Sequence, residues 1–165
     1  MPNTSVFTGA DASIALAGTT PGTEGEKAKG IVDAYGLGTV GRAQNVKVNV
    51  LSTVRPFHEI GQRYATELRP GNVAINGTIG RAFINGAMLK LLLGDAADSR
   101  PSGSWVQPSF NITLLVENPA QPDVRSTVTI HDAKFDNWAY SLPEDDFVLE
   151  SLSFQALYIT VKDEP

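Results

Sequence analysis

The 165-residue chain has no cysteine and only two histidines. The missing cysteines exclude disulfide frameworks, thiolate zinc sites and cysteine nucleophiles. A chain of this length can bury a hydrophobic core as one domain without disulfide or metal cross-links. Neither a G-x-S-x-G elbow nor a phosphate-binding P-loop occurs. These absences favour a binding or structural role over an enzyme, although an enzyme with a site scattered over several loops stays open.

Positive charge is also scarce, since 13 Lys and Arg stand against 18 Asp and Glu for a formal net charge of −5. Because neutralised phosphates supply most non-specific nucleic-acid affinity, we expect no tight DNA or RNA binding. The opening MPNTSVFTGADASIALAG lacks the basic region of an export signal. Its apolar stretch is too short to span a bilayer, so we expect no membrane anchor.

One stretch invites a nucleotide-binding interpretation, because residues 36–41 read GLGTVG and match G-x-G-x-x-G. That fingerprint needs a helix after the glycines, whose N-terminus receives the pyrophosphate. Instead, Val46, Val48 and Val50 alternate with polar residues, which is the pattern of a half-buried strand. The glycines are better explained as bends in a segment that leads into this strand.

A two-residue period dominates most of the chain. It predicts strands over 44–54, 58–69, 73–83, 110–116, 124–131 and 147–161, with a Pro-Gly turn at 69–72 and an exposed loop or arm at 18–30. One short helix is predicted at 86–93, between Asn85 as N-cap and Gly94 as its stop.

The predicted fold class is mainly β: an antiparallel two-sheet β-barrel or sandwich with one short flanking α-helix and an extended N-terminal arm. Residues 1–43 would form an N-terminal strand and Gly-rich arm of the same domain as the barrel over 44–165. Open strand edges in such a fold offer unpaired N–H and C=O groups to another copy of the chain.

The segment FVLESLSFQALYITV, residues 147–161, is apolar on both faces of the predicted strand. In a small domain with one core, the second face needs either the helix at 86–93 or a neighbouring subunit to cover it. The predicted subunit interface is therefore the set Phe147, Leu149, Leu157 and Ile159.

Residues that could carry chemistry are few. His58-Glu59 and His131-Asp132 are sequence neighbours on predicted strands, so each pair points to opposite faces. Glu144, Asp145 and Asp146 lack the spaced ligands and glycine turn of a calcium loop and indicate a solvated turn. We predict no catalytic, cofactor-binding or metal-binding residues.

A resemblance emerges over residues 59–95. Gly61-x-Arg63, Pro70-Gly71, a strand through Gly77-Thr78-Ile79, then RAFING at 81–86 and an apolar helix ending at Leu93-Gly94 follow in order. This order resembles the major tail tube proteins of tailed viruses. The closing FVLESLSFQALYITV after PEDD, and the opening VFTGADASIALAG, are similar to the last and first strands of that family.

The resemblance implies a virion structural protein, made in the host cytoplasm, whose hexameric rings stack into a hollow tail tube. Its partners would be further copies of itself and the sheath, tail-terminator and baseplate proteins, and DNA would pass the lumen without specific binding. Six copies at −5 would give −30 per ring, so we expect an acidic channel wall. The hairpin carrying Arg55, Phe57 and His58 and the arm at 1–43 would dock one ring on the next.

Two alternatives stay open at this point. The tube of a type VI secretion system or another phage-like contractile injection machine would share the fold and the ring. From a different class, a monomeric glycan-binding β-sandwich would use Trp105, Trp138 and Tyr140 as an aromatic platform.

Overall fold

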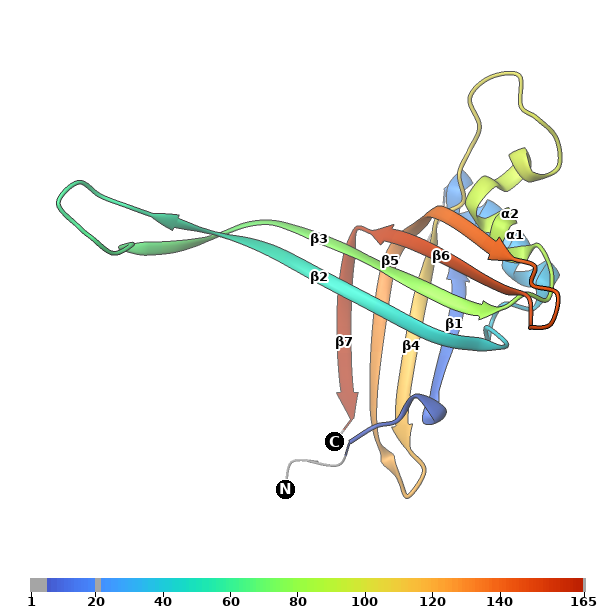
Figure 1. Ribbon diagram of the computed structural model, residues 1–165, viewed down its shortest axis with the longest axis horizontal. Coiled ribbons are helices and arrows are strands. Elements are labelled where there is room, and N and C mark those ends of the chain that lie inside the picture. Colours follow the sequence, from blue (N-terminus) through green and yellow to red (C-terminus); the bar gives the residue numbers. More distant parts are fainter. Residues whose placement is uncertain (1–5, 20–21, 165) are drawn as a thin grey trace.

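The computed structural model describes residues 6–19 and 22–164. Seven strands form one antiparallel sheet in the order β1-β4-β5-β6-β3-β2, with β7 paired to β5 (Figure 1). The strands are β1 (Ala12–Gly18), β2 (Ala43–Phe57), β3 (Glu67–Ala82), β4 (Phe110–Asn118), β5 (Gln121–Ser141), β6 (Leu149–Ala156) and β7 (Tyr158–Glu164). The helices are α1 (Thr23–Tyr35) and α2 (Ala87–Leu93), with 3₁₀ turns η1 (Gly9–Asp11) and η2 (Gly94–Ala97).

The sheet curls because β5 changes direction near its middle. Asp132 has a φ of 55°, and an extra residue bulges where Phe110 pairs with Ala133 but Ile112 pairs with Ile130. At the same level a single residue, Leu157, separates β6 from β7, and its N–H donates to the His131 carbonyl at 3.1 Å. Both strands therefore bend together.

The bend divides the sheet into two halves that run in different directions (Figure 1). The terminal half consists of β1, β4, β7 and the first part of β5, up to His131. The arm half consists of β2, β3, β6 and the second part of β5, from Lys134 to Ser141.

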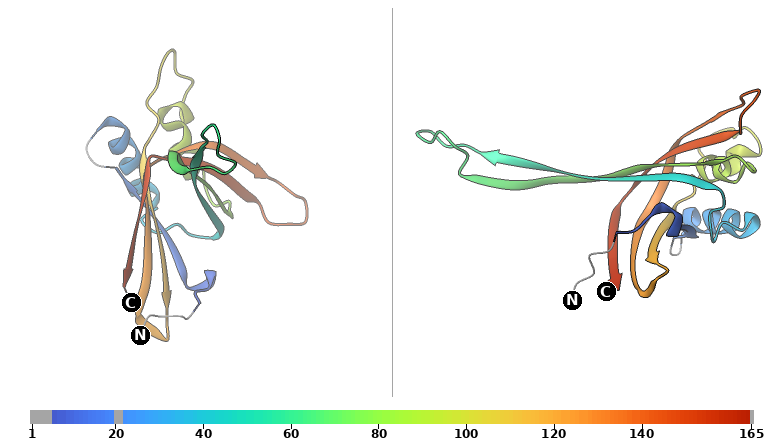
Figure 2. Two further views of the ribbon diagram at one scale, coloured as in Figure 1. Left: turned by 90° about the vertical axis from the view of Figure 1, so that its left-hand side faces the viewer. Right: turned by 60° about the horizontal axis from the view of Figure 1, so that its bottom comes forward.

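The hydrophobic core fills the space between these halves. Phe110 and Phe135 face each other across the bend with ring centroids 4.8 Å apart. Both helices lie at one end of the sheet (Figure 2), where they bury their small and apolar residues. The buried apolar residues are Ile14, Leu16, Ala28, Val32, Leu37, Val40, Ile75, Ile79, Ala87, Met88, Leu91, Phe110, Ile112, Ile130, Ala133, Phe135, Leu152 and Phe154.

The structure confirms a mainly β fold and a helix at the predicted place, α2 at Ala87–Leu93. Its N-cap is Gly86 rather than the predicted Asn85, whose side chain lies one residue earlier and accepts the Ala87 N–H at 3.0 Å. The prediction of two sheets is wrong, because the long bent strand β5 keeps both halves in one sheet. The prediction of a single helix is also wrong, because residues 23–35 form α1, which buries Gly25, Ala28 and Val32.

The expected N-terminal arm is likewise corrected. Within the described residues, the stretch 12–18 is edge strand β1 and residues 23–35 are helical, so this part of 1–43 is packed on the body. The loop expected at 18–30 is wrong for residues 23–30, which belong to α1. Residues 1–5 and 20–21, which these predictions also covered, lie outside the described residues.

The single strand expected over 147–161 is instead β6 and β7, broken at Leu157. The break reverses which residues face the core: Leu152 and Phe154 are buried before it, whereas Ile159 packs against the core after it. The two apolar faces seen in the sequence therefore arise from two short strands with opposite alternation.

The turn predicted at 69–72 is a bulge inside β3. Ser52 pairs with Val73 and Val54 pairs with Pro70, so Gly71 and Asn72 together oppose Thr53. A Cβ on Gly71 would come within 2.4 Å of the Thr53 carbonyl oxygen, which explains the glycine. The strand predicted over 58–69 is wrong for residues 58–66, which form the loop at the end of the hairpin, because β2 continues to Phe57 and β3 begins only at Glu67.

The GLGTVG stretch follows a helix rather than preceding one. Gly36 adopts the left-handed conformation, with φ 65° and ψ 37°, and its N–H bonds to the Val32 carbonyl at the C-terminus of α1. The carboxyl end of a helix carries partial negative charge, which disfavours a phosphate.

Candidate functional site

A two-stranded arm is the most exposed feature of the molecule. β3 pairs with β6 only from Ile75 onward, so residues 51–74 project from the body as a hairpin supported on neither side (Figure 1). Every arm residue is exposed except Gly71, which is partly covered. An isolated two-stranded hairpin is only marginally stable in water. We therefore expect an arm of this length to be stabilised by contact with another chain.

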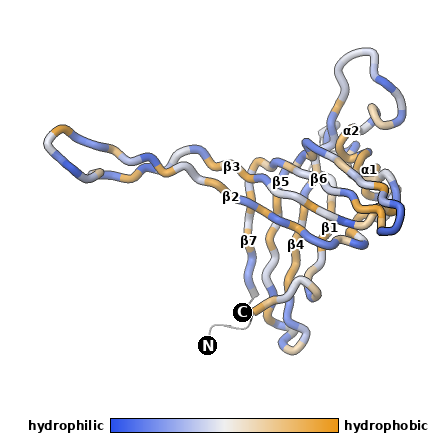
Figure 3. The backbone as a smooth tube through the Cα atoms, in the orientation of Figure 1, coloured by the Kyte–Doolittle hydropathy of each residue, from blue (hydrophilic) through white to orange (hydrophobic). Residues whose placement is uncertain are grey.

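Apolar and hydrophilic residues are interspersed along this hairpin arm (Figure 3), and many of the apolar ones are exposed. Tyr64 is 82% exposed, and Ile60 is exposed completely. The other large apolar residues exposed on the arm are Leu51, Val54, Phe57, Leu68 and Val73. So many solvent-facing apolar groups along one segment mark an interaction site.

The outward side of the arm half is polar. Its residues alternate with the buried ones along β2, β3 and β6, whereas a bulge in β5 places the consecutive residues Asp136 and Asn137 on this side. Most of them carry amide or hydroxyl groups. We call the following set the polar face: Asn45, Lys47, Asn49, Asn76, Thr78, Asp136, Asn137, Ser151, Ser153 and Gln155. It contains one lysine and one aspartate, so its formal charge is zero. Lys134, which pairs in register with Gln155 at the border of this face, is neutralised by Glu24 at 2.9 Å.

Asp136 is held in place on the polar face by its neighbours on β6. The Ser153 hydroxyl donates to one carboxylate oxygen, and the Gln155 amide donates to the other at 3.0 Å. The hydrogen bond from Ser153, followed by that from Gln155, lowers the pKa of Asp136 below its ordinary value. This carboxylate therefore stays ionised well into the acid range.

The arm half has an open edge on each side. Within the described residues, β2 pairs with β3 alone, and the Lys134–Ser141 part of β5 pairs with β6 alone. The Gln107 amide donates to the Phe135 carbonyl at 2.6 Å and covers one backbone group at the β5 edge. Open edges are templates for strand addition by another chain.

A buried polar cluster joins three strands of the arm half. Arg81 on β3 pairs in register with Glu150 on β6, and the Arg81 Nε donates to Glu150 Oε1. Trp138 on β5 donates its indole N–H to Glu150 Oε2 at 2.8 Å. Both charged side chains are at most 2% exposed, and Arg81 Nη2 has no hydrogen-bond partner among the described residues.

Sequence reasoning missed this cluster, although its signal was present. Glu150 occupies the same alternation as Leu152 and Phe154, and Arg81 the same alternation as Ile75 and Ile79. A charged residue on the apolar face of a strand needs a partner, but only the strand register shows that these two face each other.

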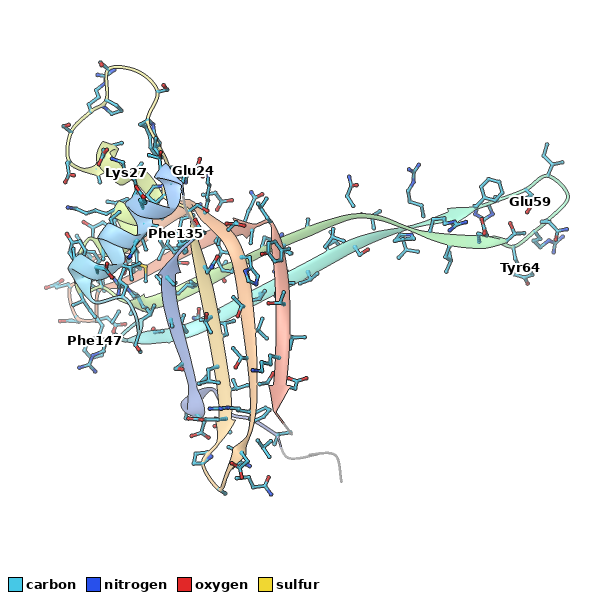
Figure 4. The ribbon with its side chains drawn as sticks, turned by 180° about the vertical axis from the view of Figure 1, so that it is seen from behind. Glu24, Lys27, Glu59, Tyr64, Phe135 and Phe147 are labelled. Atoms are coloured by element: carbon cyan, nitrogen blue, oxygen red, sulfur yellow. The ribbon has the colours of Figure 1, made fainter. Side chains whose placement is uncertain are left out.

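The structure separates the residues predicted for the subunit interface. Phe147, 78% exposed, lies at the end of the arm half that is remote from the hairpin arm (Figure 4), and Leu149, two residues later, begins β6. Leu157, 74% exposed, lies at the bend, whereas Ile159 packs against the core. Arg55 and Phe57 belong to the arm portion of β2, and His58 begins the loop at its tip.

Among the described residues, neither histidine forms a hydrogen bond or ion pair with a carboxylate. His131 stacks on Tyr158 with ring centroids 4.2 Å apart and hydrogen-bonds Thr160 at 2.9 Å. No cluster of three His, Asp or Glu residues among those described is placed to hold a metal. A cleft of about 750 Å³ beside the N-terminus of α1 is lined by Glu24, Asp132 and Lys134 among other residues, and Lys134 pairs with Glu24 at 2.9 Å.

The aromatic residues considered for glycan binding do not form a flat platform. Trp138 packs against the core and points its N–H at Glu150, and its ring is tilted 39° from that of Tyr140. Trp105 lies in the loop between η2 and β4. Across the described segments, no helix is long and apolar enough to cross a membrane.

This chain is similar to known proteins in its three-dimensional structure but not in its sequence. The chain matches no family model and no curated protein sequence. It superposes on the cap that terminates the tube of the anti-feeding prophage with a TM-score of 0.68, at 10% identity over 99% of this chain and 95% of that one.

Two further structures extend this likeness. The sheath/tube terminator of the extracellular contractile injection system PVC gives a TM-score of 0.65, at 12% identity over 96% of this chain and 97% of that one. The SPP1 tail tube gives 0.56, at 15% identity over 96% of this chain and 80% of that one. The chain therefore shares its fold with tail tube, tube-cap and tube-terminator proteins.

Proposed function

We propose that this chain is a non-enzymatic structural subunit whose hexameric rings stack into the hollow tube of a tail-like particle. One observation carries the proposal: the arm half has four antiparallel strands, an open edge at each side and a polar outward face. Strand β2 at one edge and strand β5 at the other run in opposite directions. Pairing β2 of one copy with β5 of the next therefore continues the antiparallel alternation.

Closure of such a ring removes every open edge of the arm half. Six copies of four strands would make a barrel of 24 strands, and barrels well below that size already enclose an aqueous channel. The polar face is the side suited to line the channel, since the opposite side of the same strands forms the core. The remaining predicted subunit contacts, Phe147, Leu149 and Leu157, lie on exposed surface available to neighbours.

The lining in this proposal differs from the acidic wall expected from composition. The polar face has no net formal charge, so the excess acid of the chain lies elsewhere. A neutral surface of amides and hydroxyls neither attracts nor repels phosphates strongly. DNA would therefore pass through a neutral channel without specific binding, as it would through an acidic one.

In a particle, the subunit would be part of a virion tail made in the host cytoplasm, in contact with sheath, tail-terminator and baseplate proteins. A second candidate is the cap or terminator of a contractile injection tube, favoured by the fold shared with two such proteins. Both candidates need six-fold rings, and only the tube subunit needs rings that stack indefinitely.

Electron microscopy of the purified protein at high concentration tests the proposal. We expect rings or striated hollow tubes with six-fold symmetry. Isolated six-fold rings that never stack would favour the cap or terminator. Compact monomers at every concentration, including after addition of preformed tube ends, would contradict a tube role.

Leu157→Asp should abolish rings without unfolding the chain. The side chain is mostly exposed, so the free energy of unfolding should change by no more than about 0.5 kcal/mol. A carboxylate buried between subunits without a partner would block their contact. Analytical ultracentrifugation should find monomers, while Leu157→Met should assemble normally; normal rings from Leu157→Asp would remove this residue from the interface.

Cysteine labelling can measure the charge of the channel, because the chain has no native thiol. In tubes of Ser151→Cys, cationic and anionic thiosulfonate reagents should react in the same ratio as with the unassembled variant. Adding Asn76→Asp places six carboxylates in each ring and should raise the ratio toward the cationic reagent. A preference for the cationic reagent before that change would contradict a neutral lining.

A further inference from the structure

A groove of about 420 Å³ opens beside the free edge of β2, between the start of that strand and the terminal half. The larger apolar residues that line it are Ile14, Val40, Val46, Leu114 and Val116. Arg42 also lines the groove, and its guanidinium has no hydrogen bond or ion pair with any described residue. The β2 edge of the arm half therefore presents an unpaired cation beside an apolar groove.

The backbone holds Arg42 at the end of β2 that is remote from the hairpin arm. Its carbonyl accepts the Ala82 N–H at 3.0 Å, and β2 begins at the next residue, Ala43. Its φ is 61°, a left-handed conformation that is uncommon for an arginine. The position of this cation relative to the strand edge is therefore set by the fold.

The opposite edge of the arm half carries complementary groups. Tyr140, near the end of β5, is 45% exposed, and its ring is supported by Phe83 with centroids 5.4 Å apart. β5 ends at Ser141, and the next segment contains three exposed carboxylates that we call the acidic turn, Glu144, Asp145 and Asp146. None of the three pairs with a cation among the described residues. This edge therefore presents an aromatic ring followed by unpaired anions.

Strand register relates the two edges. Asn45 on β2, Gly80 on β3, Ser151 on β6 and Ala139 on β5 form one row across the arm half. When β2 of one copy pairs with β5 of the next, like sides of the sheet must match, so the register changes in steps of two residues. Without a shift, Asn45 opposes Ala139 of the neighbour.

Closed barrels stagger their strands, and here the stagger has one favourable direction. A shift toward the hairpin arm places Lys47 or Asn49 opposite Ala139 and keeps the whole edge at 134–141 paired, because β2 continues to Phe57. A shift the other way moves this edge past the start of β2 at Ala43. In all three favourable registers, Arg42 comes level with the end of β5 or with the chain that follows it.

We propose that Arg42 of one copy pairs with the acidic turn of the next copy in the same ring, whose Tyr140 covers the mouth of the groove. The inference rests on the proposed function, because it specifies which contact sets the register between neighbours in a ring. Tyr140 lies on the same side of β5 as Trp138, which packs against the core, so it meets the side of β2 that carries Val46. Complementary charges at such a contact select one register over others.

Charge reversal with rescue tests the pairing. Arg42→Glu should abolish rings or raise the protein concentration that they need by about tenfold or more, since like charges then meet at six contacts. Glu144→Arg with Asp145→Arg should do the same, and combining the three substitutions should restore rings. Arg100→Glu, on an exposed loop outside both surfaces, is the matched control and should leave rings unchanged. Circular dichroism should show every variant folded, because all these side chains are exposed.

A cysteine scan measures the register independently. Ala139→Cys is combined with Asn45→Cys, Lys47→Cys or Asn49→Cys in three separate chains, which contain no other thiol. Within one copy these edges are three strand spacings, roughly 14 Å, apart, so a short bis-maleimide links different copies. One of the three chains should give covalent oligomers that stop at six, because a contact inside a ring closes on itself.

The outcomes separate this contact from the tube function. Normal rings from Arg42→Glu, absence of rescue in the combined chain, or rings that cross-link at none of the three positions would overturn the pairing and leave the tube function standing. A wild-type chain that forms neither rings nor tubes would overturn both.

Discussion

Glu150→Ala should lower the free energy of unfolding by about 3–5 kcal/mol. The substitution removes the only carboxylate that faces the buried Arg81 guanidinium among the described residues, and it leaves a charge without compensation in the core. Trp138 loses the acceptor of its indole N–H at the same time. Urea unfolding followed by Trp fluorescence measures the change.

Two controls separate the ion pair from a general effect of acidic residues. Glu144→Ala, on an exposed turn, should change stability by no more than about 0.5 kcal/mol. Arg81→Met with Glu150→Leu should recover most of the loss, because apolar side chains of similar volume often replace a buried ion pair at little cost. A double variant as unstable as Glu150→Ala would mean that the pair itself, rather than its unbalanced half, supports the fold.

Removing the hairpin arm should eliminate tubes and leave the domain folded. Leu51 pairs directly with Ala74, so an Asn-Gly type I′ turn can replace residues 52–73 and close β2 onto β3. The deleted residues are exposed, apart from partly covered Gly71, and contribute little to the core. Calorimetry should show a thermal midpoint within a few degrees of the full chain, while electron microscopy shows rings or monomers only.

A single substitution sharpens the same test. Phe57→Ala removes one large exposed ring at the end of β2 and should shorten tubes or raise the concentration they need. Val161→Ala, which also removes an exposed apolar side chain but lies on β7, outside the hairpin arm and residues 1–43, is the matched control and should leave tubes unchanged. Long and stable tubes from both the deletion and Phe57→Ala would contradict a stacking role for the arm.

Local patterns in the sequence predicted the elements whose residues alternate cleanly. Phe110, Ile112 and Leu114 alternate with polar neighbours, and β4 forms there. The helix at 86–93 was recognisable from Asn85, its leucines and Gly94. The helix α1 was missed although Ala28, Ile31, Val32 and Tyr35 have helical spacing, because Gly25, Gly30 and the flanking Thr, Pro and Gly residues are typical of a loop.

The sequence by itself determined that the chain is mainly β, that it has no disulfides, and that the apolar residues of 147–161 need a cover beyond one small core. These properties depend on composition and on the alternation within each strand. The tertiary structure alone decided that residues 147–161 are two strands, that Arg81 faces Glu150, and that the polar face is neutral. Those features depend on strand register and on the bend at Asp132, which join residues far apart in the chain and leave no local periodic signal.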